Sequence, residues 1–425
     1  TPILGRVGDM VGKERVFVAT LIALAIGSLL AAVAPSIGVM IVARVIQGIG
    51  GGMVPVAFGI IRDEFPADKV TGAIGALASL TAVGAGLGIV LAGPIVDALG
   101  YHWLFWLPLI LTVIAAISAV LFVPESEVRT PGRISWLPAV LLSAWLVALL
   151  VALSEAPAWG WASAHVIGLL VAAVVFAAVW VFSELRAATP LIDMKMMRQT
   201  AVWTNNLVAL LIGVGMYATF AFLPEFVQTP SAAGYGFGAD ITRSGLMLLP
   251  SSITMFAVGM FAGRLTRRLG GKVLVVAGCL IGAVAMAILA FAHSQQWEIY
   301  LSNAIMGVGF GLAFSAMSAL IVAAVPPAQT GVASGMNANI RTIGGSIGAA
   351  VMASIVTSQL APSGLPKESG YTTGFAVMAA GLLLAAIAGR LIPTSRRPQS
   401  AVAEPEHGEL AMVAGGAATD EAVGA

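Results

Sequence analysis

Residues 5–15 read GRVGDMVGKER, a glycine-rich segment with charges of both signs directly before a long apolar run. The same order, glycine-arginine-apolar followed by glycine-lysine, recurs at GRL (residues 263–265) and GGK (residues 270–272). Two more glycine patterns recur at nearly the same offset of about 258 residues: GIGGG at 48–52 matches GVGFG at 307–311, and Gly72 matches Gly331. Three matches at one offset predict two copies of one unit in the same orientation.

The composition excludes an ordinary soluble protein. The chain has 425 residues, of which 59% are hydrophobic and 10% charged, with a mean hydropathy of +0.97, whereas soluble domains carry about 25% charged residues. A helix needs about 20 apolar residues to cross a bilayer, and the sequence supplies about eleven or twelve such runs. They are predicted at 16–34, 38–61, 70–96, 103–123, 135–154, 162–183, 201–227, 243–265, 273–292, 298–325, 332–358 and 372–392. The expected fold is an all-α, polytopic membrane protein.

The repeat also predicts the domain organisation. The runs at 135–154 and 162–183 have no repeat partner, so they are expected to be a two-helix central insert between two bundles. The predicted domains are a first bundle at 1–126 holding helices 3–6, an insert with linkers at 127–198, a six-helix bundle at 199–392 and a disordered tail at 393–425. Because only four residues precede Gly5, about two helices of the first bundle are expected to be missing upstream.

Charge in the joints predicts the orientation. Nearly all of the 21 Lys and Arg residues fall in one alternate set of joints, whereas the other set holds only Arg243 and Lys367. Cytoplasmic loops collect positive charge. The chain is therefore expected to cross the plasma (inner) membrane many times, with its C-terminus in the cytoplasm.

Residues 5–15 resemble the loop signature between the second and third helices of the major facilitator superfamily. In that family the aspartate sits at a helix end and helps latch one conformation, which implies this role for Asp9, with Gly5, Gly12 and Lys13 in the same motif. Met10 stands where the family has an arginine. The alternative interpretation is a short, positively charged turn.

Two further motifs resemble the same family. Arg44, Gln47 and Gly48 match the fourth-helix signature, in which a buried arginine serves proton coupling. An intramembrane charge costs at least about 2.5 kcal/mol, so Arg44 is expected to face a bundle interior or an aqueous cavity.

Gly75, Gly84 and Gly88 match a fifth-helix glycine pattern that resembles the antiporter subgroup, followed by Gly93 and Pro94. Ile89 stands in place of the family's proline, and the alternative role of such glycines is close helix packing. With the two extra helices, residues 1–395 resemble the fourteen-helix drug:proton antiporters, lacking the first one to two helices. The resemblance implies export of drug-like or antibiotic molecules in exchange for protons, by alternating access.

A substrate cavity is expected along the run at 332–358. Asn337 and Arg341 share one helix face, and Arg341 lies roughly 14 Å in from the end of the run, near the middle of a bilayer core of about 30 Å. Asn205 and Asn206 are weaker candidates. Glu225 is a candidate carboxylate for cationic substrates, although a solvated rim residue is the alternative.

Several classes are set aside by what the sequence lacks. No basic stripe suggests nucleic acid, the single cysteine, Cys279, allows no disulfide framework or metal site, and no catalytic cluster indicates an enzyme.

No cofactor is expected beyond a proton gradient, and the protein is expected to be a monomer that takes lipophilic or cationic small molecules. None of the 20 acids lies deep in a run, so the proton-carrying acid is expected in the missing first helix and the fragment alone is expected not to transport. An importer or facilitator with this fold remains the alternative function.

Overall fold

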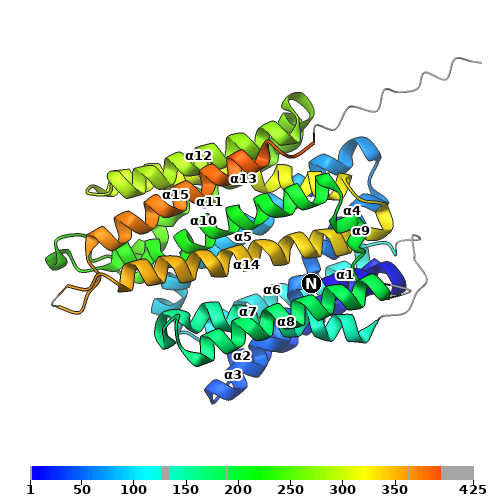
Figure 1. The fold of residues 1–425 in the computed structure, drawn as a ribbon, viewed down its shortest axis with the longest axis horizontal. Helices are drawn as coiled ribbons and strands as arrows, with labels where there is room; N and C mark the ends of the chain where they lie inside the picture. The colour runs from blue at the N-terminus through cyan, green and yellow to red at the C-terminus, as the bar shows by residue number, and fades with distance from the viewer. Residues whose placement is uncertain (1, 126–134, 188–189, 362, 394–425) are drawn as a thin grey trace, which may run out of the picture. The chain divides into compact units, whose positions relative to one another are not determined.

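The computed structural model describes residues 2–125, 135–187, 190–361 and 363–393. Its helices form two sets, and a further pair of helices stands between these sets in the order of the chain (Figure 1). The first set comprises α1 (Pro2–Val11), α2 (Lys13–Ala32), α3 (Ile37–Ile49), η1 (Gly50–Gly52), α4 (Met53–Glu64), α5 (Ala67–Leu99) and α6 (Trp103–Phe122). The insert comprises α7 (Trp136–Trp159), α8 (Ala164–Arg186) and the short α9 (Met194–Met197). The second set comprises α10 (Thr200–Gln228), η2 (Ser231–Ala233), α11 (Ile241–Leu269), α12 (Gly271–Phe291), α13 (Gln296–Ala323), η3 (Pro327–Gln329), α14 (Thr330–Thr357) and α15 (Glu368–Gly389).

Helix length and composition fit a membrane. Eleven spans in the described residues are long and apolar enough to cross a bilayer, and α5 has 33 residues. The eleven spans correspond to eleven of the twelve predicted runs, and α5 corresponds to the run predicted at 70–96, so the predicted all-α, polytopic fold is confirmed. The predicted tail lies outside the described residues, apart from Pro393. The boundaries predicted near residues 126 and 198 remain predictions.

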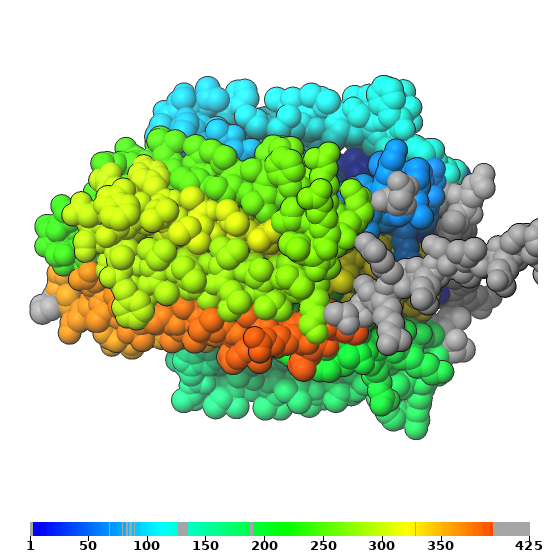
Figure 2. Space-filling model, turned by 90° about the horizontal axis from the view of Figure 1, so that it is seen from above, coloured from blue at the N-terminus to red at the C-terminus, as the bar shows by residue number. Residues whose placement is uncertain are grey.

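Apolar side chains cover the outer surface, as expected for contact with lipid. Figure 2 shows one such surface, where α12 and α15 lie next to each other. Val284 on α12 and Ile387 on α15 are 54% and 62% exposed. In water such a surface would be an aggregation hazard, so the exposure of these residues supports a bilayer as the surrounding solvent.

The predicted repeat has a counterpart in the packing. α2 packs against α3 and α6, and α12 packs against α13 and α15 in the same order. The joint before α2 turns at Gly12 with φ +126°, and the joint before α12 turns at Gly270 with φ +87°. Only a glycine adopts such backbone angles readily. Gly5 and Gly8 lie inside α1 rather than in the turn, which corrects the expectation that the whole segment is a loop.

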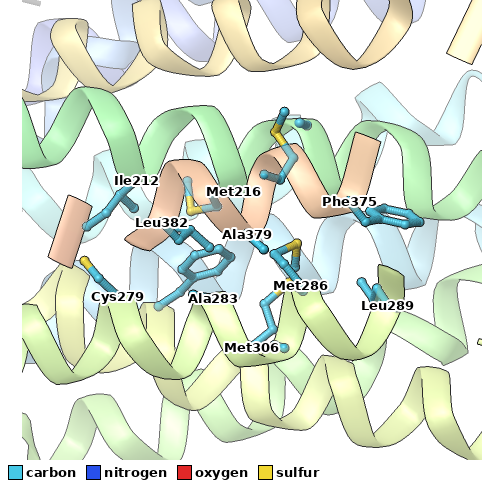
Figure 3. Close-up of a cluster of buried hydrophobic side chains, with 14 of the residues drawn as sticks. Ile212, Met216, Cys279, Ala283, Met286, Leu289, Met306, Phe375, Ala379 and Leu382 are labelled. Atoms are coloured by element: carbon cyan, nitrogen blue, oxygen red, sulfur yellow. The ribbon is translucent and has the colours of Figure 1, made fainter. Parts of the chain in front are cut away.

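The largest apolar core lies in the second set. It is built from side chains of α10 to α15, several of which are shown in Figure 3. Met216, Met286 and Met306 fill the space between helices, where their flexible thioethers suit an irregular interior. Cys279 is 1% exposed and packs among the apolar side chains of this core.

The insert is attached to α14. Leu142 of α7 and Trp180 of α8 share an apolar cluster with Val332 and Met336 of α14. Near the other end of α14, Nε1 of Trp161 donates a hydrogen bond to Oγ of Ser354 at 2.8 Å. The insert therefore contacts α14 at two well-separated points along its length.

A buried carboxylate fixes the chain where the insert ends. Glu184 of α8 is 3% exposed and accepts hydrogen bonds from the backbone N–H groups of Leu191 and Ile192 at 2.9 and 3.2 Å. It also accepts one from Nε1 of Trp180 at 3.2 Å. Two of the three donors are backbone N–H groups that no helix satisfies there, and the third is the indole N–H of Trp180.

Candidate functional site

The two helix sets touch through glycines at one end of the molecule. We call this the basic end, because the helix ends that meet there, of α1 and α2, α4 and α5, and α11, carry positive residues: Arg6, Lys13, Arg62, Lys69, Arg264, Arg267 and Arg268. A Cβ on Gly5 of α1 would lie 2.5 Å from the carbonyl carbon of Gly331 on α14. A Cβ on Gly263 of α11 would lie 2.6 Å from Cα of Gly72 on α5. No side chain fits at either Gly5 or Gly263 without separating the helices.

Asp9, the predicted latch residue, lies in a buried charge cluster at this end. Nζ of Lys13 is 2.5 Å from Oδ2 of Asp63 and 3.7 Å from Oδ1 of Asp9. All three side chains are at most 3% exposed. Burial raises the pKa of Asp9 to about 7, against the opposing effects of Lys13 and Arg6. The Asp9 carboxyl can therefore gain or lose a proton near neutral pH.

Arg62, next to Asp63 on α4, reaches across to the second set. Its Nη1 donates hydrogen bonds to the carbonyl oxygen of Val322 on α13 and to Oγ1 of Thr330, the first residue of α14. Arg62 thus connects the charge cluster with the beginning of α14.

Arg44 takes part in a small polar network on α3. Its Nη1 donates to Oε1 of Gln47 at 3.3 Å, and Nε2 of Gln47 donates to Oγ of Ser28 on α2 at 3.0 Å. The guanidinium also lies 5.1 Å from the ring centroid of Phe105 on α6. The structure brings Arg44 and Gln47 together but leaves Arg44 exposed, and it places Gly48 on an open surface.

The glycines of α5 differ in their surroundings. A Cβ on Gly75 would lie 3.6 Å from Cβ of Ser315 on α13, and one on Gly93 would lie 2.7 Å from backbone atoms of Thr242 on α11. Next to Gly93, Oγ1 of Thr242 donates to Oδ2 of Asp97 at 2.9 Å. Gly84 and Gly88 are exposed, with no described atom within 4 Å of an added Cβ, and Pro94 lies inside the helix and is exposed. Of these four glycines of α5, Gly93 is therefore the one at which a neighbouring backbone comes too close for a side chain, whereas Gly75 makes an ordinary contact.

A cavity of about 230 Å³ lies between the two helix sets. Its walls come from η1 and α4, from Thr81 of α5, and from α13 and α14. A smaller cavity of about 90 Å³ shares Thr81, Phe314 and Arg341 with it and adds walls from α10 and α11. We call the two together the central cavity. Because helices of both sets line it, a movement of one set against the other would change its access.

Arg341 lies where the two parts of the central cavity meet. Its guanidinium carbon is 4.2 Å from the ring centroid of Phe314. Its Nε is buried with no hydrogen-bond partner. Asn337, one helical turn earlier, also lines the cavity, so the structure brings these two predicted residues together on one wall.

The other predicted cavity residues lie elsewhere. Oδ1 of Asn206 accepts a hydrogen bond from Nδ2 of Asn337 at 2.9 Å, which places Asn206 behind the cavity wall. Asn205 is fully buried and donates to the carbonyl oxygen of Met317 on α13 at 3.0 Å. Glu225 is exposed near the end of α10, next to the aromatic cluster of Phe226, Tyr235 and Tyr371.

Sequence reasoning missed several residues of the site. Arg62 and Asp63 stand in the joint between the runs predicted at 38–61 and 70–96, where Arg62 counts only towards the orientation and Asp63 is not singled out. Phe314, Ser334 and Tyr217 looked like ordinary residues of apolar runs. A usable signal existed for Asp63, because an acid beside an arginine at a helix end pairs readily with a lysine at another helix end.

Comparison with known proteins agrees with this architecture. The pattern that defines the Major Facilitator Superfamily matches residues 1–349. The chain is 30% identical over 396 residues to the multidrug resistance protein B homolog of Mycobacterium tuberculosis, covering 88% of this chain and 72% of that protein. It is 29% identical over 364 residues to multidrug resistance protein 3 of Bacillus subtilis, covering 84% and 69%.

Two further likenesses extend the comparison. The tetracenomycin C resistance and export protein of Streptomyces glaucescens is 26% identical over 360 residues, covering 84% of this chain and 66% of that protein. The crystal structure of the human organic anion transporter MFSD10 (TETRAN) superimposes with a TM-score of 0.66 at 17% identity, covering 91% and 79%, and shows the shared fold. The chain therefore belongs to the major facilitator superfamily and is a multi-pass membrane transporter related to multidrug efflux proteins.

Proposed function

We propose that the protein exports lipophilic, drug-like or antibiotic molecules across the plasma membrane in exchange for protons. One observation carries the proposal: a largely apolar and aromatic cavity lies between the two helix sets and is lined by both. Such cavities, with few fixed polar groups, accept varied lipophilic molecules. Relatives named for multidrug resistance and for tetracenomycin C export support this substrate range.

Alternating access is the mechanism that fits the contacts. At the basic end, Gly5 meets Gly331 and Gly72 meets Gly263, so the cavity is closed there. Positive joints favour the cytoplasm, and we assign the basic end, and with it the C-terminus, to that side. Rocking of the two sets would break the glycine contacts and open the cavity to the cytoplasm.

Asp9 and Arg44 are the residues we assign to coupling. A carboxyl with a pKa of about 7 changes its charge over the physiological range, and its charge alters the balance of attraction on Lys13. When Asp9 is protonated, Lys13 still pairs with Asp63; when Asp9 is ionised, two carboxylates share one ammonium group. Arg44 sits at the other candidate coupling position, held by Gln47.

Proton-linked transport by the reconstituted protein is the test. Liposomes loaded with acid and a pH-sensitive dye would receive lipophilic test compounds from outside. We expect proton flux that depends on the compound and is lost in Arg44→Ala, with Arg268→Ala as a control at an exposed arginine. Uptake of labelled compound without any proton flux would favour a facilitator and remove proton exchange from the proposal.

A further inference from the structure

Arg341 is a cation without a counter-ion near the middle of a membrane helix. It stands eleven positions after Thr330, where α14 begins, or about 16 Å along the helix at 1.5 Å per residue. Among the described residues, no carboxylate forms an ion pair with it, and its Nε has no hydrogen-bond partner. A charge at this depth is energetically costly unless a partner or water compensates for it.

The contacts of Arg341 compensate for only part of that cost. The guanidinium carbon of Arg341 lies 4.2 Å from the ring centroid of Phe314, where the quadrupole of the ring attracts the cation. The hydroxyl of Tyr217 lies beside the guanidinium within the same cavity. Neither group carries a full negative charge, so the site can still accept an anion.

The remaining polar groups of the central cavity also suit an acceptor. The hydroxyl of Ser334 is buried without a hydrogen-bond partner, and Asn337 adds an amide group to the same walls. The Thr81 hydroxyl also lines the cavity, but it donates its proton to the carbonyl oxygen of Leu77 at 2.9 Å. No Asp or Glu belongs to the described lining. A ligand cation entering this cavity would meet Arg341 with no carboxylate to balance it, whereas an anion would find a charged donor and neutral ones.

Aromatic rings define the rest of the space. Phe58 and Phe314 line the larger part, and Tyr217 and Phe220 line the smaller part. Flat faces of this kind favour planar ring systems through offset or edge-to-face contacts. The cavity therefore combines ring surfaces with one anion-binding group.

We infer that the central cavity selects planar aromatic molecules that carry a carboxylate or phenolate, with Arg341 binding that acidic group. The inference names the substrate class of the proposed export function and so rests on it. It departs from the cationic ligands expected from the sequence, because Glu225, the carboxylate expected to attract cations, is exposed near the end of α10 and absent from the cavity lining.

Equilibrium binding to the purified protein tests the inference without requiring transport. The probes share one ring system and differ in charge: 2-naphthoate as the anion, methyl 2-naphthoate as the neutral ester and 2-naphthylmethylammonium as the cation. We expect the anion to bind at least tenfold more tightly than the cation. Arg341→Gln should lose that preference and keep its affinity for the ester, whereas Arg341→Lys should keep part of the preference because it retains the charge.

Arg268→Gln is the matched control, since it removes an exposed arginine at the end of α11 and should leave all three affinities unchanged. Equal or tighter binding of the cation by the unmodified protein would overturn the inference, and so would an anion preference that survives in Arg341→Gln. If Arg341→Gln does not fold, the three probes on the unmodified protein and on Arg341→Lys still decide. Anion-selective binding together with absent proton-linked transport would sink the proposed exchange alone, whereas transport without anion selectivity would sink this inference alone.

Discussion

The backbone of Gly5 lies directly against that of Gly331, so that a Cβ on Gly5 would be 2.5 Å from the Gly331 carbonyl carbon. At the same basic end, Gly263 of α11 makes the related contact with Gly72 of α5. The sequence repeat equates Gly5 with Gly263 and Gly72 with Gly331. The two contacts are therefore copies of one another with the helix sets exchanged, and closure of the basic end uses one interface twice.

The first prediction is that Gly5→Ala opens the basic end. The added methyl group overlaps the backbone of α14, and overpacking of this kind costs about 1–3 kcal/mol, which shifts a two-state balance by roughly tenfold. Spin labels at Arg15 on α2 and Arg268 on α11 would report the change as a longer distance. The native Cys279 is 1% exposed and should not take up label.

Gly72→Ala is the matched control for that experiment, because no described atom lies within 4 Å of its added Cβ. Its distance distribution should equal that of the unmodified protein, while Gly263→Ala, which meets Gly72 at 2.6 Å, should behave like Gly5→Ala. If all three variants gave the same distribution of distances between the spin labels, the glycine contacts would not control closure of the basic end.

Most of the fold could be predicted from the sequence because the bilayer sets the length of each apolar run. The run predicted at 298–325 is observed at Gln296–Ala323 and the run at 103–123 at Trp103–Phe122. The 3₁₀ turn at Gly50–Gly52 was not predicted. Hydropathy is insensitive to it, since three glycines leave a run apolar while loosening the helix.

The candidate site was predicted less completely, since it depends on which side chains meet. Arg341 could be singled out because a charge inside an apolar run is costly wherever it faces. Phe314 could not, because its role comes from lying 4.2 Å from that guanidinium. Lys13 and Asp63 are 50 residues apart in the chain, and only the fold brings them together.

Asp9 should make stability depend on pH. Its pKa is raised from 3.8 to about 7 in the folded protein, so the folded state binds the proton more tightly than the unfolded state. The stability that protonated Asp9 contributes to the folded state is therefore fully present below about pH 4 and is lost as the pH rises towards 7. We expect Asp9→Asn, which cannot ionise, to flatten the fall in stability between pH 5 and 8 by at least about 1 kcal/mol.

Unfolding in mixed detergent at several pH values measures this effect. Glu64→Gln, at an exposed position at the end of α4, should keep the slope of the unmodified protein. If the unfolding free energy of Asp9→Asn changed with pH as steeply as that of Glu64→Gln and of the unmodified protein, Asp9 would not titrate in this range.

The contact between the insert and α14 should be energetically coupled. Trp161→Phe removes the indole N–H that Ser354 accepts at 2.8 Å, and Ser354→Ala removes the acceptor together with its own bond to Ala350. A double-mutant cycle separates the shared bond from these side effects. We expect a coupling of about 0.5–1.5 kcal/mol, measured by unfolding, whereas strictly additive losses would mean that the insert is not held to α14 at this point.

The position of Arg341 should depend on a glycine of the neighbouring helix. A Cβ on Gly213 of α10 would overlap the carbonyl oxygen of Arg341, so α10 and α14 can approach this closely only because position 213 has no side chain. We expect Gly213→Ala to push α14 away and to destabilise the protein by about 1–3 kcal/mol or more. Gly381→Ala on α15 adds a methyl group at an ordinary contact, 3.8 Å from Cγ1 of Val214, and should be neutral.

Two measurements on both variants check this prediction. Unfolding gives the loss of stability, and the reactivity of a cysteine placed at Ala338 in the cavity wall reports whether α14 has moved. Equal effects of the two alanines would mean that α10 does not set where Arg341 lies.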